Sequence, residues 1–379
     1  MRFLYCAIDQ HVPGTKGGSV HVEAVAEGLA ALGHEVHVLV TRGDGRFPPG
    51  RVRWIPMSPP LGAKQLRWAR TGAVRRLCEG LRPDAVIERY YNFGGEGIAA
   101  ARTVGATAVL EVNAPVIDYA GSPKAALDRM LVVQPMRRWR ERMLAAADLI
   151  VTPRAAILPP GTPPAKILEL EWGADTETFS PDVRGRPPFK RPAPVVAIFA
   201  GAFRSWHGAV RLAEALETLR ARGRKDIGAV FVGDGPELSR VRAAAAKLEA
   251  VVFTGALPHA AIPACLGAAD IGVAPFDIGA HSALSLGFYW SPLKMFEYMA
   301  AGLPVVAPAV DRIPSLVQHE REGLLYDPRA PGALAAALER LTDARLRASL
   351  GAAARDRAVR EYSWRAHCTA LADAVERVR

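Results

Sequence analysis

Two charged side chains lie three residues apart in the stretch SPLKMFEYMAAGLPVVAP, residues 291–308. Ser291 is a good N-cap and Pro292 suits the first helical position, so Lys294 and Glu297 fall in the first two turns of a predicted helix. Side chains at this spacing can form a surface ion pair worth about 0.3–0.5 kcal/mol. The same turns also offer unpaired backbone N–H groups, so the location favours a bound ligand over an ion pair.

Three other stretches place glycine where a predicted strand passes into a helix: GTKGGS (14–19), GAFRSWHG (201–208) and FVGDGPE (231–237). Glycine there permits close approach of the backbone to an anion or a sugar, and Arg204 and His207 could face such an anion. The first loop matches the spacing of neither the dinucleotide fingerprint nor the P-loop. A flexible or tight turn explains each loop as well, so the sequence leaves both interpretations open.

These loops are positioned by short apolar runs that alternate with amphipathic stretches. One alternation runs from residues 2–8 to 149–153 and another from 195–201 to 323–326. The segment 153–194 between them is rich in proline and glycine, which indicates a linker. The pattern predicts an α/β protein with two Rossmann-like parallel-sheet domains, and such sheets bind ligands at the carboxyl ends of their strands.

A chain of 379 residues is too long for one ordinary core and long enough for two. We place the N-terminal domain at residues 1–172 and the C-terminal domain at residues 173–355. The remaining residues, 356–379, are expected to form a helix that packs back toward the N-terminal domain.

The formal net charge of +10 favours an anionic partner. The arginines are scattered and form no dense basic arm with interleaved aromatics, so nucleic acid is not an expected partner. The four cysteines form no C-x-x-C pair, which fits a reduced cytosol better than a disulfide framework or a zinc site. No apolar run reaches the roughly 18–20 residues of a transmembrane helix, and the N-terminus becomes polar by Asp9, too soon for a signal peptide. We therefore expect a cytoplasmic protein whose membrane contact, if any, is peripheral and at the inner face.

Seven segments occur in a common order along the chain. They are the Gly17-Gly18 loop, WGADTETFSP (172–181), FAGAFRSWHG (199–208), FVGDGPE (231–237), VVFTGALPHAAIPACLGAADIGVAPF (251–276), SPLKMFEYMAAGLPVVA (291–307) and IPSLVQHEREGLLYDP (313–328). Together they resemble the retaining, nucleotide-sugar-dependent glycosyltransferases of family four, which have the two-domain GT-B fold, and in particular a subgroup with the pattern SPLK-x-x-E-Y-M-A-A-G. The match covers most of the second domain and less of the first.

The resemblance implies transfer of a hexose, with retention of anomeric configuration, from a nucleotide-sugar donor held mainly by the second domain. The acceptor, held mainly by the first, would be a hydroxyl of a glycan, a lipid-linked molecule or a small molecule. The family needs no metal, so no cofactor is expected, and the departing phosphate helps to take the acceptor proton. Such a site requires cations and N–H dipoles where negative charge grows at the diphosphate. It does not require the two flanking carboxylates of a glycosidase.

Position by position, the resemblance makes Glu297 the second glutamate of the family's E-x7-E element, which accepts hydrogen bonds from the two ribose hydroxyls. It places Leu257 in the loop that contacts the base. The full donor-binding set that it implies is Gly17, Gly18, Arg204, Gly233, Gly235, Leu257, Tyr289, Leu293, Lys294 and Glu297.

The sequence departs from the family pattern at three positions. The first glutamate of E-x7-E is Tyr289, and the family's phosphate-binding arginine and lysine are Ala202 and His207. Imidazole is only partly charged near neutral pH, at an unperturbed pKa of about 6.5. We expect Arg204 and Lys294 to supply the missing positive charge.

The stretch EVNAP, residues 111–115, lies where many family members carry a catalytically important histidine. Glu111 and Asn113 are the polar groups available there, and together with His207 they form the predicted catalytic set. A strand end capped by Asn113 and stopped by Pro115 explains the stretch equally well.

The stretch RMLVVQPMRRWRERM, residues 129–143, mixes arginines with methionine, leucine and Trp139 and could rest on an anionic membrane. Its arginines include Arg137, Arg138, Arg140 and Arg142. A solvated helix with its arginine stems over the core is the commoner arrangement. Two other functions also stay open. One is a GT-B-type nucleotide-sugar epimerase, and the other is a non-catalytic partner subunit that binds a nucleotide sugar.

Overall fold

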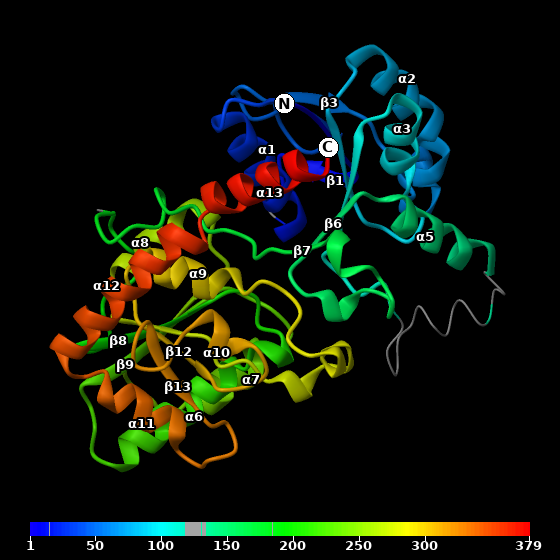
Figure 1. Cartoon of the computed structure of the whole chain (residues 1–379). Coiled ribbons are helices and arrows are strands. Elements are labelled where there is room, and N and C mark those ends of the chain that lie inside the picture. The colour runs from blue at the N-terminus through cyan, green and yellow to red at the C-terminus, as the bar shows by residue number, and fades with distance from the viewer. Residues whose placement is uncertain (15, 118–129, 131–133, 184) are drawn as a thin grey trace. The chain divides into compact units, whose positions relative to one another are not determined.

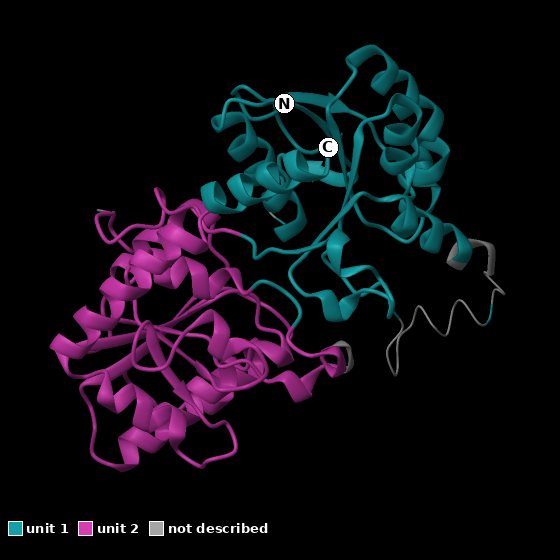
Figure 2. Ribbon diagram, viewed as in Figure 1, with its two compact units in different colours: residues 1–172, 289–291, 364–379 teal, residues 173–288, 292–363 magenta. Residues whose placement is uncertain are grey.

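The computed structural model describes residues 1–14, 16–117, 130, 134–183 and 185–379 (Figure 1). The chain forms two compact units (Figure 2). Unit 1 comprises Met1–Trp172, Tyr289–Ser291 and Trp364–Arg379, and unit 2 comprises Gly173–Phe288 and Pro292–Ser363. Each unit is built on one parallel sheet, which confirms the predicted pair of Rossmann-like α/β folds.

Unit 1 contains a seven-stranded parallel sheet in the order β3-β2-β1-β4-β5-β6-β7. Its strands are β1 (Arg2–Val12), β2 (Glu35–Arg42), β3 (Arg53–Pro56), β4 (Ala85–Arg89), β5 (Thr107–Glu111), β6 (Leu149–Thr152) and β7 (Ile167–Glu169). Its α-helices are α1 (Gly17–Ala31), α2 (Thr71–Leu81), α3 (Glu96–Val104), α5 (Gln134–Ala146) and α13 (Trp364–Val378). Its 3-10 helices are η1 (Pro60–Gly62), η2 (Lys64–Arg70), η3 (Ala155–Ile157) and η4 (Pro164–Lys166).

The two faces of the unit 1 sheet bury separate apolar clusters, because successive side chains of a strand point to opposite faces. On β1, Phe3 and Tyr5 pack in one cluster with α1 and α13. Leu4 and Cys6 pack in the other with α2 and α3. Helices on both faces explain why these strands are continuous apolar runs.

Unit 2 contains a six-stranded parallel sheet in the order β10-β9-β8-β11-β12-β13. Its strands are β8 (Val195–Ala200), β9 (Ile227–Val232), β10 (Val251–Gly255), β11 (Ile271–Val273), β12 (Val305–Pro308) and β13 (Gly323–Tyr326). Its α-helices are α6 (Ala209–Ala221), α7 (Leu238–Ala244), α8 (Ile262–Gly267), α9 (Leu293–Ala300), α10 (Ile313–Leu316), α11 (Ala333–Arg340) and α12 (Ala344–Glu361). Its 3-10 helices are η5 (Ser205–His207), η6 (His259–Ala261), η7 (Ile278–Ala280) and η8 (Ser282–Leu286). The strand order reverses between β8 and β11, the point at which open parallel sheets bind ligands.

The structure refines two local predictions. Inside the predicted linker, β7 pairs with β6 as the edge strand of the unit 1 sheet. The boundary proposed at residue 356 falls inside α12, and the helix that belongs to unit 1, α13, begins at Trp364. In the part of the chain that the structure describes, no helix combines the length and the apolar character needed to cross a membrane.

The packing of α13 on α1 depends on one glycine. A Cβ built on Gly28 of α1 would lie 2.5 Å from Cys368 Sγ of α13. We expect Gly28→Ala to lower the free energy of unfolding by about 1–3 kcal/mol, because the two helices would have to move apart. Urea denaturation followed by circular dichroism measures this change.

The matched control is Gly80→Ala in α2, where an added Cβ has no atom within 4 Å. That substitution should raise the free energy of unfolding by about 0.4–1 kcal/mol, because alanine restricts the unfolded chain. Equal effects at the two positions would mean that α13 does not pack on α1 in solution.

Candidate functional site

The loops at the carboxyl ends of β8, β9 and β10 are joined through their backbones. Gly201 N–H donates to the Val232 carbonyl, and Gly233 N–H donates to the Gly255 carbonyl, each over 2.9 Å. Two of the loops predicted from sequence therefore meet at one edge of the unit 2 sheet. This edge includes β8, which borders the reversal of strand order.

Two glycines of the β9 loop are required by this contact. Gly233 and Gly235 have φ angles of 125° and 151°, in the region that favours glycine. A Cβ on Gly233 would lie 2.1 Å from the Gly201 carbonyl oxygen, and one on Gly235 would lie 2.7 Å from Phe203 N. Packing between the two loops therefore explains both glycines, and their contact with a nucleotide stays a prediction.

The ammonium group of Lys294 is buried beside this edge. It lies 4.1 Å from the centroid of the Phe199 ring and 5.4 Å from that of the Phe276 ring. A Cβ on Gly201 would be 3.1 Å from Lys294 Nζ, so glycine leaves the space that the ammonium occupies. Among the described residues the ammonium has no hydrogen-bonding partner. Two cation–π contacts only partly offset the loss of hydration.

Burial lowers the pKa of Lys294 to about 7, although the nearby Glu297 carboxylate acts in the opposite direction. A buried cation that lacks a partner is a common sign of a functional site. Here it indicates an anionic ligand that would supply the missing partner.

His207 does not replace the cation that the family pattern places at its position. Burial, followed by the Lys294 charge, lowers the pKa of His207 to about 3, so the ring is neutral near pH 7. Its Nδ1–H donates to the Ala202 carbonyl. The expectation of partial positive charge on His207 is therefore corrected, and such a low pKa also makes it a weak general base.

Arg204 is exposed in the same loop, with its guanidinium 5.5 Å from the centroid of the Trp206 ring. The structure assigns it no carboxylate partner among the described residues. It is therefore available to an anion that enters beside Lys294.

Glu297 and Lys294 do not pair with each other, which excludes the surface ion pair as the explanation of their spacing. The Glu297 carboxylate lies 3.4 Å from His259 Nε2 of η6, in the loop after β10. The hydrogen bond from His259 to Glu297 raises the pKa of His259. Leu257, which we predicted to contact the base, lies half-buried two residues before His259.

The second turn of helix α9 is hydrogen-bonded to the end of β8, whereas backbone N–H groups in its first turn have no partner among the described residues. Tyr298 Oη accepts a 2.8 Å hydrogen bond from Ala200 N–H at the end of β8. The helix begins at Leu293, and no side chain caps it. The structure gives the N–H groups of Leu293 and Lys294 no partner among the described residues. These groups leave two unpaired donors in the first turn of the helix that carries Lys294.

The prediction that Ser291 caps this helix is wrong. Its hydroxyl donates to Glu171 Oε2 over 2.7 Å and accepts the Trp172 N–H over 2.9 Å, all within unit 1. Tyr289 also belongs to unit 1, where it packs at the margin of an apolar cluster and meets the Trp290 ring edge to face. The donor-binding role predicted for Tyr289 therefore stays a prediction.

In unit 1, Glu111 is the centre of a closed polar network. Its carboxylate lies 2.7 Å from His21 Nε2 and 2.8 Å from Arg89 Nη1, and the Tyr5 hydroxyl donates to it. Burial alone would raise the pKa of Glu111, but His21, Arg89 and Tyr5 together hold that pKa well below its ordinary value. With its oxygens engaged in this way, Glu111 is suited to positioning rather than to proton transfer.

Asn113 belongs to the same network. Its amide donates to Glu111 and its oxygen accepts a 2.9 Å hydrogen bond from Trp172 Nε1. Gly18 lies beside the network, since a Cβ there would be 3.5 Å from Arg89 Nη2. Among the described residues no atom lies within 4 Å of a Cβ added at Gly17, so their packing does not explain that glycine.

Residues 129 and 131–133 of the arginine-rich stretch lie outside the described residues. Its residues 134–143 belong to α5, and part of this helix packs into unit 1. Trp139 Nε1 donates to the Gly94 carbonyl over 2.7 Å, and Arg140 is buried and donates to Asn92. Arg138 and Arg142 are exposed, whereas the side chain of Arg137 lies outside the described residues. The aromatic residue that a membrane helix would present therefore faces the protein.

Sequence reasoning missed several members of these groups, among them His21, Arg89, His259 and Tyr298. His21 follows the glycine pair by one helical turn, and His259 follows the predicted base-contacting loop, so both were polar residues near a marked loop. Arg89 and Tyr298 sit in apolar or mixed runs that gave no local signal.

Comparison with known proteins identifies the family. The model described as "Glycosyl transferases group 1" matches residues 194–344, and that described as "Glycosyltransferase Family 4" matches residues 15–158. The chain is 31% identical to "D-inositol 3-phosphate glycosyltransferase" of Acidothermus cellulolyticus, over 89% of this chain and 80% of that protein. It is 28% identical to "GDP-mannose-dependent alpha-mannosyltransferase" of Mycobacterium tuberculosis, over 98% of this chain and 95% of that protein.

The fold has solved counterparts as well. The crystal structure of Anabaena Alr3699/HepE in complex with UDP superposes with a TM-score of 0.65 at 18% identity and covers 100% of both chains. At that identity the likeness concerns the fold alone. The two family models and the 31% identical relative show that this chain belongs to glycosyltransferase family four. The two parallel sheets and the solved counterpart show that it has the GT-B fold.

Proposed function

We propose that this glycosyltransferase moves a sugar from a nucleoside diphosphate donor bound by unit 2 to a hydroxyl acceptor bound by unit 1. We further propose that transfer retains anomeric configuration and needs no metal ion. The observation that carries the proposal is the buried, unpartnered Lys294 ammonium at the edge where the β8, β9 and β10 loops meet. An anionic diphosphate is the partner that such a cation lacks.

Each part of the donor has a counterpart in unit 2. The diphosphate is assigned to Lys294, to Arg204 and to the free N–H groups at the start of α9. The ribose diol is assigned to Glu297, whose two carboxylate oxygens can each accept one hydroxyl and which His259 holds in place. The base is assigned to the loop around Leu257.

Lys294 supplies the positive charge that the transfer reaction requires at the diphosphate. As the bond between sugar and diphosphate breaks, negative charge grows on the departing phosphate oxygens. A fixed cation in a water-poor site stabilises that charge more than it stabilises the intact donor. The ammonium thus stabilises the charge on the leaving group, as a divalent metal ion does in other enzymes. The departing phosphate is the proposed acceptor of the proton from the incoming hydroxyl.

In the proposed mechanism, anomeric configuration is retained without a carboxylate of unit 1 acting as the nucleophile. Glu111 is ionised but its oxygens are taken by His21, Arg89 and Tyr5. Attack of the acceptor on the same face as the departing phosphate leaves this network intact. Glu111 and Asn113 then act as positioning residues, with His21 and Arg89 as their partners.

The names of the relatives support the substrate classes. The mannosyltransferase is named as dependent on GDP-mannose, and the Anabaena structure contains UDP. The first relative acts, by name, on inositol 3-phosphate, which is a polyol phosphate. We propose a GDP- or UDP-linked hexose as the donor, and a polyol or its phosphate as the first acceptor to test.

Donor binding is tested with a thermal-shift panel of GDP, UDP, ADP, TDP and CDP. A ligand at a hundred times its dissociation constant stabilises the protein by about 2.7 kcal/mol. We expect at least one nucleotide to raise the Tm of the wild type. Lys294→Met should raise the Tm of the free protein, by about 2–4 °C for each kcal/mol gained, and should abolish most of the nucleotide shift.

The second variant is Glu297→Gln, which should weaken nucleotide binding by about 1.5–3 kcal/mol and leave the free protein nearly as stable as before. Arg222→Gln, far from the assigned donor groups and on a surface ion pair with Glu339, is the control and should bind normally. A flat response of the wild type to the whole panel would refute the donor-site assignment.

Donor binding should depend on pH through Lys294. Its pKa of about 7 in the free protein means that the charge is largely lost above that pH. Because a diphosphate binds the charged form, binding above pH 7 requires proton uptake and should weaken by up to about tenfold per pH unit. The measurement is the dissociation constant between pH 7 and 9, above the second phosphate pKa of about 6.

The titration of Lys294 affects the stability of the free protein in the opposite direction. Rising pH weakens donor binding but increases the free energy of unfolding. An unfolded lysine has a pKa of about 10.4, so the unfolded chain binds more protons than the folded one between about pH 7 and 10. The free wild type should therefore gain stability with rising pH relative to Lys294→Met. Identical pH profiles of the two proteins, in both binding and stability, would contradict a titrating Lys294.

Turnover separates the transferase from the two rival functions. The neutral His207 and the alanine at 202 are the observations that favour a binding-only partner subunit. An α-linked donor with inositol 3-phosphate or a broader panel of hydroxyl acceptors should give an α-linked product, read from the anomeric coupling constant in proton NMR. Nucleotide binding without any product would favour the partner subunit, conversion of donor without acceptor would favour an epimerase, and a β-linked product would exclude retention.

A further inference from the structure

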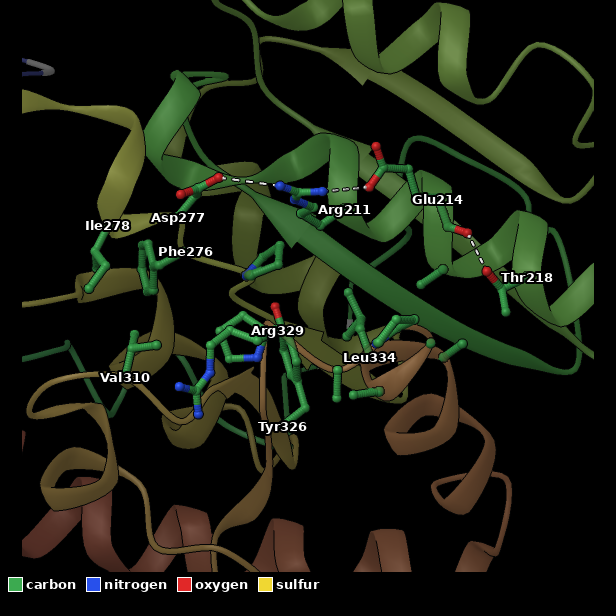
Figure 3. A pocket seen from close by; sticks show the side chains of 18 residues that line it. Arg211, Glu214, Thr218, Phe276, Asp277, Ile278, Val310, Tyr326, Arg329 and Leu334 are labelled. Carbon is green, nitrogen blue, oxygen red and sulfur yellow. Dashed lines mark hydrogen bonds and ion pairs between the residues drawn. The ribbon is translucent and has the colours of Figure 1, made fainter.

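Unit 2 contains a cavity of about 380 Å³ that the proposed function does not use. Figure 3 shows it from close by. It opens between α6, the loop that follows β11, Val310 beyond β12, and the segment from the end of β13 to the start of α11. Lys294, Glu297 and His207 are absent from its lining, although Phe276 forms part of its wall and also contacts the Lys294 ammonium. Its size is that of a small-molecule site.

Charges of both signs line this cavity. Arg211 lies between two carboxylates, 3.2 Å from Glu214 and 3.6 Å from Asp277. Figure 3 shows Arg211 between the two, with Arg329 on the other side of the cavity. Arg329 is largely exposed and pairs with Asp327. The two arginines and two acids of the lining balance, so the cavity offers no net charge to a strongly ionic ligand.

The hydroxyl of Tyr326 is a polar side-chain group of the lining that lacks a hydrogen-bonding partner among the described residues. Tyr326 is 8% exposed, and Figure 3 shows its oxygen directed toward the middle of the lining side chains. The structure gives that oxygen no hydrogen-bonding partner within the described part of the chain. Burial raises the pKa of Tyr326, so the hydroxyl stays protonated and can both donate and accept.

Backbone donors complete the polar part. Helix α11 begins after Gly332, which has a φ of 73° and no side chain to cap the helix. The backbone N–H groups of Leu334 and Ala335 belong to the first turn of α11. Within the residues that the structure describes, they have no hydrogen-bonding partner. Apart from Thr218, the rest of the lining is mainly apolar and includes Phe276, Ile278 and Val310.

We propose that this cavity binds a neutral, hydroxyl-rich ligand of sugar size. Hydroxyl groups each donate and accept, which suits a wall where carboxylates, a phenol and N–H groups alternate. The C–H face of a sugar ring suits the apolar wall. The balanced charge disfavours a phosphate or a carboxylate as the occupant. This site goes beyond the proposed transfer reaction, since none of the donor residues lines it.

The test is saturation-transfer NMR on the full chain with D-glucose, D-mannose, D-galactose and myo-inositol as separate probes, without nucleotide. At least one probe should receive saturation from the protein. Tyr326→Phe, which removes one oxygen, should raise the dissociation constant of that probe about three- to tenfold. Asp277→Asn should do the same, and both variants should keep the wild-type thermal shift with nucleotide as proof of folding.

Glu297→Gln is the matched control, because it alters the donor site and should leave the sugar signal unchanged. If no probe receives saturation, or if Glu297→Gln rather than Tyr326→Phe removes the signal, the cavity is not a sugar site. Broadening of the phosphorus line of inorganic phosphate that is lost in Arg211→Met, with silent sugars, would also overturn the proposal and indicate an anion site. These outcomes are independent of whether transfer itself is observed.

Discussion

The unit 2 site depends on one unfavourable arrangement, a lysine ammonium buried against two phenylalanine rings without a partner. Lys294 can hold this position because Gly201 leaves the space for it and because Tyr298 anchors α9 to the end of β8. A folded protein gains nothing from a desolvated cation by itself. The arrangement is understandable if a ligand supplies the opposite charge, and we propose that the phosphates of a nucleotide sugar are that ligand.

The glycines have a different physical origin. Gly233 and Gly235 let the β9 loop touch the β8 loop backbone to backbone, and a hydrogen bond from Gly233 N–H to Gly255 adds the β10 loop. The result is a rigid edge on which Arg204, His259 and the start of α9 are held. Specificity for one base or one sugar can then vary in side chains while this backbone frame is unchanged. In unit 1, side-chain contacts of Glu111 with His21 and Arg89 hold the polar network together, in place of the backbone contacts seen in unit 2.

Much of this was predictable from local signals. Alternating apolar runs predicted both sheets, and the spacing of Lys294 and Glu297 on a short helix pointed to the place that we propose as the donor site. The predictions that were wrong concerned side chains whose partners lie far away in the sequence. Ser291 looked like a helix cap, but its hydroxyl bonds to Glu171, 120 residues earlier. The charge of His207 could not be read from its type, because burial and the Lys294 ammonium set its pKa. The catalytic role of Glu111 stays a prediction, and its pairing with His21 and Arg89 is a long-range contact that the local sequence does not show.

The central claim is that a nucleoside diphosphate becomes the partner of the Lys294 ammonium. Calorimetric titration with GDP or UDP at about pH 8, in buffers of different ionisation enthalpy, counts the protons taken up on binding. Uptake of about one proton by the wild type and none by Lys294→Met is the predicted result. Binding by the wild type with no proton uptake, or equal uptake in both proteins, would contradict it.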